Sequence, residues 1–192
     1  LGSQHYGIEP DMVTMAKGVA SGYAAISCTV TTEAVFEAFK ANPNDPMSHF
    51  RDISTFGGCT AGPAAALANV ETIENENLLD NVTAMGEYMQ EKLRGLAGKH
   101  NVIGEVRGKG LFIGAELVSD RETKEALPEA MVMGVVADCM AKSAVIIGAT
   151  NRSLPGLNNT LCFSPSFIAS KSDIDEIIEA VDGALTRVVA AG

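Results

Sequence analysis

The spacing of apolar and polar residues in the first part of the chain predicts two strands followed by helices. Residues 12–19 and 23–32 are rich in small and β-branched side chains, which is typical of strands, and we expect the first strand to be buried. Residues 32–39 carry apolar side chains at helical spacing. A longer helix is expected around Pro63, because a proline in the first turn of a helix loses no hydrogen bond.

The rest of the chain alternates between helical and strand-like segments. The expected elements are, in order, a break at 75–81, a helix over 82–96, two strands joined by a tight glycine turn within 101–118, a helix over 128–142, strands over 143–150 and 158–167, and a final helix that begins with a capping box at Ser170 and Asp173. We expect a domain boundary within the long helical stretch, which divides the chain into residues 1–90 and 91–192.

Composition and charge narrow the class of protein. The 192 residues are 46% hydrophobic and 20% charged, as in a soluble globular protein. A formal net charge of -10 argues against nucleic acid or a membrane surface as a partner, and its simplest meaning is solubility. No apolar run approaches the roughly 20 residues of a membrane-spanning helix, and no secretory signal is expected at the start.

The cysteines indicate neither a disulfide framework nor a metal site. They lie far apart, form no CxxC pair and have no histidine at ligand spacing: Cys28, Cys59, Cys139 and Cys162. This usage fits a reducing compartment, and we expect the protein to be cytoplasmic. Cys162 has no base beside it in sequence and is interpreted as a structural thiol.

The glycines of "GKGLFIG" come close to a dinucleotide-binding fingerprint. That fingerprint requires a helix directly after the glycines, whose N-terminus meets the pyrophosphate. Here Gly108 and Gly110 precede "LFIGAELV", which has the composition of a strand. The pattern therefore favours a hairpin turn over a dinucleotide site, and a helix after Gly110 would reverse that preference.

Lys17 is the main candidate for chemistry. It stands in "DMVTMAKGVASGY", among small and apolar residues that offer no countercharge. A neutral lysine amine attacks carbonyl groups, and an apolar setting favours the neutral form. A lysine whose stem merely passes an apolar patch would produce the same pattern, so the residues alone leave both interpretations open.

This segment resembles the cofactor-lysine signature of class III pyridoxal-phosphate aminotransferases, the omega-amino-acid group. The matching residues are Asp11, Met12, Val13, Ala16, Lys17, Ser21 and Gly22. The segments "STFGGCTAGPAAALANVETIENENLLDN", "EVRGKGLFIGAELV" and "NTLCFSPSFIASKSDIDEIIEAVDGAL" are also similar to this family, so the resemblance covers essentially the whole chain. It implies an α/β fold: residues 1–90 would be the C-terminal part of a large cofactor-binding domain of fold type I, and residues 91–192 a small α+β domain.

The resemblance implies roles for two residues. Lys17 would form a Schiff base with pyridoxal 5'-phosphate and act as the catalytic general base, and Thr55 would bind the cofactor phosphate of the neighbouring subunit in a homodimer. The family's N-terminal half, with its glycine-rich phosphate loop and the Asp that pairs with the pyridinium nitrogen, has no counterpart in this sequence.

The substrate site departs from the family pattern. Several members have a carboxylate-binding arginine in the final strand, where this sequence has Cys162, and in others an arginine comes from the preceding loop. Arg152 in "NRSLPGLNN" is the candidate for that role, with a solvated loop arginine as the alternative, whereas Arg107 is interpreted as an anchor for the glycine turn.

The resemblance implies transamination between a small omega-amino donor, of the taurine or β-alanine type, and a keto acid, with pyruvate as the expected acceptor. Two alternatives stay open. One is another reaction of the same fold, namely decarboxylation, aminomutation or racemisation. The other is a non-catalytic fragment that lacks the ring-binding half of the site.

Overall fold

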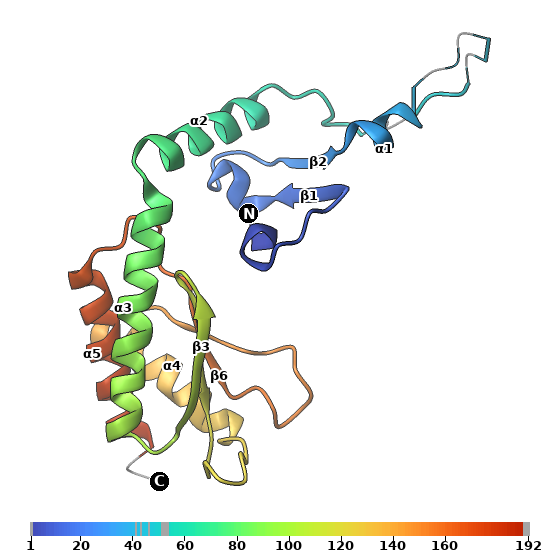
Figure 1. Ribbon diagram of the computed structural model, residues 1–192. Helices are drawn as coiled ribbons and strands as arrows, with labels where there is room; N and C mark the ends of the chain where they lie inside the picture. Colours follow the sequence, from blue (N-terminus) through green and yellow to red (C-terminus); the bar gives the residue numbers. More distant parts are fainter. Residues whose placement is uncertain (1, 41, 43, 46, 51–53, 190–192) are drawn as a thin grey trace. The chain divides into compact units, whose positions relative to one another are not determined.

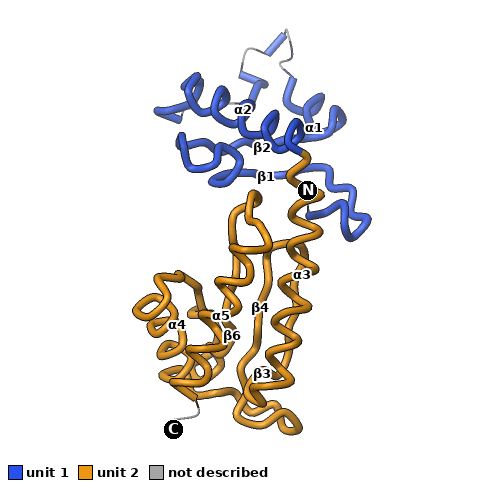
Figure 2. The backbone as a smooth tube through the Cα atoms, turned by 90° about the vertical axis from the view of Figure 1, so that its left-hand side faces the viewer, with its two compact units in different colours: residues 1–76 blue, residues 77–192 orange. Residues whose placement is uncertain are grey.

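The computed structural model describes residues 2–40, 42, 44–45, 47–50 and 54–189, and it divides into two compact units. Unit 1 extends to Glu76 and unit 2 begins at Asn77 (Figure 2). This division lies earlier than the boundary expected between residues 90 and 91. The reason is that Met85 and Met89, which lie before residue 90 on the long helix Leu78–Lys99, are already buried in the core of unit 2.

Unit 1 contains a two-stranded antiparallel sheet and one long helix (Figure 1). Its elements are the 3-10 helix η1 (Gly2–Tyr6), strand β1 (Met12–Ala16), the 3-10 helix η2 (Lys17–Ala20), strand β2 (Ser27–Thr31) and helices α1 (Glu33–Glu37) and α2 (Ala61–Asn75). The register pairs Val13 with Val30, and α2 packs against η2. The expected strands and helices are therefore present, and Pro63 lies in the first turn of α2.

The expectation that the first strand is buried is wrong for this chain. Within the described residues β1 and β2 have only each other as strand neighbours, and none of their residues is fully buried. Met12 is 60% exposed and Val30 is 53% exposed. A two-stranded sheet cannot bury its own side chains, because burial needs a second layer packed on one face.

Unit 2 is a four-stranded antiparallel sheet packed against three helices (Figure 1). Its elements are α3 (Leu78–Lys99), β3 (Ile103–Lys109), β4 (Phe112–Leu117), α4 (Glu129–Ser143), β5 (Gly148–Ala149), β6 (Thr160–Phe163) and α5 (Lys171–Val188), and the strand order is β3-β4-β6-β5. Along β4 the alternate residues Ile113, Ala115 and Leu117 are buried, as period-two patterning requires.

The predicted break between the two long helices is confirmed. Asn77 adopts a left-handed conformation with φ of 52°, which ends α2 and starts α3. The expected apolar face of α3 is buried at Met85, Met89 and Leu93. The capping box of α5 is also confirmed, since the Ser170 amide donates to the Asp173 carboxylate over 2.7 Å and the Asp173 amide donates to Ser170 Oγ over 3.3 Å.

The glycine turn is a hairpin, because β4 and not a helix follows Gly110. Gly110 has φ of 53°, a left-handed conformation that favours glycine. Helix α3 passes so near this turn that a Cβ on Gly86 would lie 2.3 Å from the Gly110 carbonyl oxygen. The sequence led us to expect that Arg107 anchors this turn, but its guanidinium instead pairs with the carboxylates of Glu105 and Glu116, each over 2.7 Å.

The last two strands along the chain, β5 and β6, are shorter than predicted. Residues 143–150 form strand only at Gly148 and Ala149, and 158–167 only from Thr160 to Phe163. The length of each strand follows its pairing: β5 pairs with β6 only at Gly148–Cys162 and Ala149–Leu161, and β6 pairs with β4 only over Thr160–Phe163. An apolar sequence cannot specify that length, because strand length depends on how far the neighbouring strand continues alongside.

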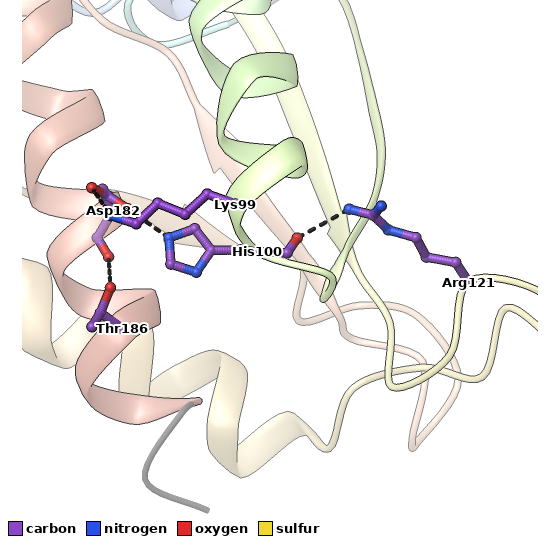
Figure 3. A network of polar contacts seen from close by, with 5 residues as sticks. All are labelled: Lys99, His100, Arg121, Asp182 and Thr186. Carbon is purple, nitrogen blue, oxygen red and sulfur yellow. Dashed lines mark hydrogen bonds and ion pairs between the residues drawn. The ribbon is translucent and has the colours of Figure 1, made fainter.

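A polar network joins the end of α3 to α5 (Figure 3). His100 Nε2 donates to Asp182 over 2.6 Å, and Lys99 Nζ lies 2.7 Å from the same carboxylate. From the other side Arg121 donates to the carbonyls of His100 over 3.0 Å and Ile103 over 3.1 Å, which satisfies acceptors after the helix end.

Within the part of the chain described, no helix is both long and apolar enough to cross a bilayer.

Candidate active site

Lys17 stands at the junction between β1 and η2, in an uncommon backbone conformation. Its φ is 54°, in the left-handed region that few residues other than glycine adopt. The turn after it closes through the Ser21 amide, which donates to the Gly18 carbonyl over 3.0 Å. A strained lysine backbone held in a defined turn is a frequent feature of functional sites.

The amine of Lys17 is exposed, and none of the described residues forms a hydrogen bond or ion pair with it. The expectation of apolar surroundings for the Lys17 side chain is therefore wrong for this chain. The small residues after Lys17 form the turn and do not cover the side chain. The Lys17 side chain is therefore accessible from solvent.

Asn69 holds the Lys17 turn against α2. Its side-chain amide donates to the carbonyl of Gly18 over 3.2 Å and to that of Val19 over 3.1 Å. These are the carbonyls that directly follow Lys17, so the amide fixes the backbone on which the lysine is mounted. Sequence reasoning missed Asn69, although an amide side chain within the Ala-rich run "AAALANVE" was a usable signal.

Thr55 lies in a turn that precedes α2. The turn is built by the Gly57 amide, which donates to the Ser54 carbonyl over 3.0 Å, and by the Cys59 amide, which donates to the Phe56 carbonyl over 3.2 Å. Thr55 is exposed, and among the described residues nothing hydrogen-bonds its hydroxyl. Beside the turn is an open hollow of about 680 Å³, whose lining includes Cys28, Ser54, Phe56 and Thr60.

Arg152 belongs to unit 2 and lies in the loop between β5 and β6. Its side chain is exposed and has no hydrogen-bonding or charged partner in the described ranges. Lys17 and Thr55, in contrast, both belong to unit 1. Cys162 lies on β6, and burial raises the pKa of its thiol, which agrees with a structural thiol rather than a nucleophile.

The loop of Arg152 has a carboxylate at its side that sequence reasoning also missed. Glu129, the first residue of α4, accepts hydrogen bonds from the Gly156 amide over 2.6 Å and from the Asn158 side-chain amide over 3.0 Å. The Gly156 amide, followed by the side-chain and backbone amides of Asn158, holds the pKa of Glu129 below its usual range. The sequence shows only an acidic residue in the first turn of a helix, which is common everywhere.

Curated relatives match nearly the whole chain. It is 68% identical over 189 residues to the taurine–pyruvate aminotransferase of Rhodobacter capsulatus, covering 98% of this chain and 41% of the relative. It is 67% identical to the hypotaurine/taurine–pyruvate aminotransferase of Paracoccus denitrificans, again with 98% and 41% covered. The chain thus spans about 41% of the length of these relatives.

Solved structures agree with the fold. A Bacillus anthracis aminotransferase superimposes with a TM-score of 0.91 at 40% identity, over 97% of this chain and 41% of that one. An amine transaminase from an uncultivated Pseudomonas species, solved in its PLP-bound form, gives 0.86 at 28% identity, over 98% and 41%. These matches confirm the predicted fold class, that of the fold type I PLP-dependent transferases. The family description "Aminotransferase class-III" matches residues 1–185, and the chain therefore belongs to the class-III aminotransferase family.

Proposed function

We propose that the protein containing this chain transfers the amino group of a small omega-amino donor of the taurine type to pyruvate, with pyridoxal 5'-phosphate as cofactor. The observation that carries the proposal is 67–68% identity, over 98% of this chain, to two relatives named for taurine and pyruvate. The chain would supply the C-terminal portion of the enzyme, with residues 1–76 in the large domain and 77–192 forming the small one, as the two compact units suggest.

The residues present fit this cofactor. An aldehyde cofactor needs an accessible primary amine, and Lys17 offers one that is exposed on a turn held by Asn69. A cofactor phosphate needs hydrogen-bond donors, and the Thr55 hydroxyl is exposed for that purpose. We assign Lys17 as the residue that holds the cofactor, and Thr55 as a phosphate ligand contributed to the site of a second subunit. When bound, pyridoxal phosphate supplies an electron sink for negative charge at the donor carbon.

Lys17 has a second task once the donor has displaced it. Its Nζ would take the proton from the donor carbon and pass a proton to the cofactor within the same half-reaction, and in the second half-reaction it would move a proton in the reverse direction, to the acceptor carbon. This role demands an amine fixed within hydrogen-bond reach of one carbon. The left-handed backbone of Lys17 fixes the point from which its flexible side chain extends. The two Asn69 hydrogen bonds to the carbonyls of Gly18 and Val19 hold this backbone in place.

Arg152 is the residue we assign to the anionic end of the substrate. A guanidinium forms paired hydrogen bonds with a sulfonate or a carboxylate, which is the group that taurine and β-alanine carry beyond the amine. Arg152 is exposed, and within the described part of unit 2 no carboxylate neutralises it.

The four cysteines are unpaired, which supports a reducing compartment such as the cytoplasm.

The test is to reduce the complete enzyme with borohydride and map the pyridoxyl adduct by mass spectrometry. We expect the adduct on Lys17 and its loss in Lys17→Ala. Lys124→Ala is the matched control, because Lys124 is also an exposed lysine with a left-handed backbone, φ 60°. An adduct on another residue, or none in excess cofactor, contradicts the assignment.

A donor panel with pyruvate then tests the substrate class. Taurine, β-alanine, plain amines and ordinary α-amino acids are compared as donors, and alanine formation is measured. We expect taurine or β-alanine to give the highest kcat/KM. Preference for ordinary α-amino acids would refute the omega-amino assignment, and release of carbon dioxide without alanine would favour a decarboxylase instead.

A further inference from the structure

The loop that carries Arg152 is closed at its base by the sheet. The Thr150 amide donates to the Thr160 carbonyl over 2.9 Å, and the Thr160 amide donates back to Thr150 Oγ1 over 3.2 Å. The buried amide of Asn159 donates to the Leu117 carbonyl over 2.6 Å, which ties the loop's end to β4. Both ends of the loop are therefore held to the sheet by hydrogen bonds, and residues 151–158 between them are not held by these bonds.

The tip of the loop is a tight turn over "LPGL". The Leu157 amide donates to the Leu154 carbonyl over 2.9 Å. Pro155 and Gly156 occupy the two central positions, and Gly156 has φ of 86°, which is the signature of a type II turn. The hydrogen bond within the turn shapes the tip but does not by itself fix the tip to the body of unit 2.

Glu129 makes that contact. One oxygen of its carboxylate accepts from the Gly156 amide over 2.6 Å, the Asn158 side chain over 3.0 Å and the Asn158 backbone amide over 3.3 Å. Asn158 Oδ1 in turn accepts from the Ser153 amide over 2.9 Å. A continuous chain of hydrogen bonds thus leads from the rigid start of α4 to the residue directly after Arg152.

An acidic residue at the start of a helix usually interacts with the helix dipole alone. Glu129 differs, because its acceptor oxygen is used by amides 27 and 29 residues away in sequence, all of them in this loop. Hydrogen bonds to an ionised carboxylate are stronger than neutral ones. The carboxylate is therefore placed to order the loop.

We infer that Glu129 is a positioning residue for the proposed reaction: through Gly156 and Asn158 it holds the loop so that the guanidinium of Arg152 meets the sulfonate or carboxylate of the substrate. The inference rests on the proposed function, and specifically on the assignment of Arg152. Glu129 itself touches neither substrate nor cofactor. Its loss should affect the binding of anionic donors and leave the chemistry at Lys17 intact.

The test compares Glu129→Ala with Glu179→Ala in the holoenzyme, each with taurine and with a plain alkylamine as donor. Glu179 is the matched control, because it is exposed on α5 and bonds to no other described residue. For Glu129→Ala we expect KM for taurine to rise about tenfold with kcat changed less than about twofold, the loss that one charge-assisted hydrogen bond predicts. KM for the alkylamine stays unchanged, and Glu179→Ala changes neither donor. Glu129→Gln, which keeps the shape of the side chain, should lie between Glu129→Ala and wild type.

A double-mutant cycle separates positioning from general damage. In the Arg152→Ala background, Glu129→Ala should have no further effect on taurine, because the group that it positions is absent. Equal changes for taurine and alkylamine, or an additive loss in that background, would overturn the inference.

Amide hydrogen exchange provides a readout that does not need turnover. Gly156 and Asn158 should exchange at least about tenfold faster in Glu129→Ala, while amides of α5 keep their wild-type rates. Unchanged loop exchange refutes the role of Glu129 even if no donor is turned over. Absence of a pyridoxyl adduct on Lys17, in contrast, refutes the proposed function, so the two failures are distinguishable.

Discussion

Both units of this chain contain helices and an antiparallel sheet, but they differ in how many apolar side chains they bury. The core of unit 2 runs from Met85 to Leu185 and fully buries large side chains such as Met89 and Leu93, both 0% exposed. In the described part of unit 1 only one hydrophobic side chain, Ala20, is buried. Tyr23 is 89% exposed there. Pattern and propensity therefore form the elements in both units, but only unit 2 has enough layers to bury them.

This difference bears on the candidate site. Lys17 and Thr55 both lie in the unit that lacks a core, and both side chains are exposed. A chain that spans about 41% of the length of its relatives has neighbours in the longer proteins that are not represented here. We expect the apolar side chains of unit 1 to be covered by such neighbours or by a second subunit.

The largest expected effect comes from separating the units. Expressed alone, residues 77–192 should unfold in a single cooperative thermal transition, since their core is complete within those residues. Residues 1–76 alone should show no such transition and should bind a hydrophobic dye such as ANS, because apolar side chains are left in water. Circular dichroism and dye fluorescence measure both outcomes. A cooperative transition of residues 1–76 alone would break the comparison.

Local patterns were sufficient to predict the type and order of the elements of unit 2, but not the short lengths of β5 and β6. The capping box at Ser170 and Asp173, and the glycines around Lys109, each carry their signal within a few residues, and α5 and the hairpin were correctly predicted. The positive φ of Lys17 and the division of the chain at Glu76 were not foreseen. The boundary depends on which residues α3 packs against, and one sequence does not show that.

Long-range partners explain what was missed in the candidate site. Asn69 bonds to carbonyls 50 and 51 residues away, and Glu129 to amides 27 and 29 residues away. Neither residue type is unusual for a helix, so only the folded chain reveals its role. The resemblance to the family, in contrast, identified Lys17 and Thr55 directly, and their assignment to the cofactor stays a proposal.

A matched pair of leucines sharpens the comparison. Leu93 on α3 is 0% exposed and Leu67 on α2 is 61% exposed. Leu93→Ala should lower the free energy of unfolding of unit 2 by about 3 kcal/mol, because it removes buried contacts and leaves a cavity. Leu67→Ala should change it by less than about 0.5 kcal/mol. Urea unfolding of the whole chain, followed by circular dichroism, measures both. A loss for Leu67→Ala comparable to that for Leu93→Ala would mean that the side chain of Leu67 is buried in a cooperatively folded core after all.

A pair of glycines on α3 gives a smaller effect with opposite signs. A Cβ on Gly86 would lie 2.3 Å from the Gly110 carbonyl oxygen, whereas one on Gly95 would meet nothing within 4 Å. Gly86→Ala should therefore destabilise unit 2 by about 1–3 kcal/mol, since backbone must move. Gly95→Ala should stabilise it by about 0.5–1 kcal/mol through higher helix propensity. The same unfolding assay reads both, and stabilisation by both alanines would show that α3 does not need to approach the hairpin closely.

The smallest effect concerns the polar contact between α3 and α5. Hydrogen bonds from His100, and next from Lys99, lower the pKa of Asp182. A carboxylate with a lowered folded-state pKa stabilises the fold above its unfolded pKa, about 4, and this contribution is lost as the pH falls through the folded value. At pH 7 Asp182→Asn should cost about 1 kcal/mol or less, since the contact is partly exposed.

Between pH 4 and pH 2 the cost of Asp182→Asn should shrink toward zero, because wild type then loses the same interaction. Urea unfolding of residues 77–192 at pH 7, 4 and 2.5 measures the difference between the two proteins. Asp138, Asp173 and Asp175 also have pKa values lowered by their partners in unit 2. Because both proteins contain these residues, their contributions to the pH dependence cancel when the two free energies of unfolding are subtracted. Glu176→Gln, an exposed change on the same helix, should show no pH-dependent difference from wild type. A cost of Asp182→Asn that stays constant over this range would mean that the contact with His100 and Lys99 does not depend on the charge of Asp182.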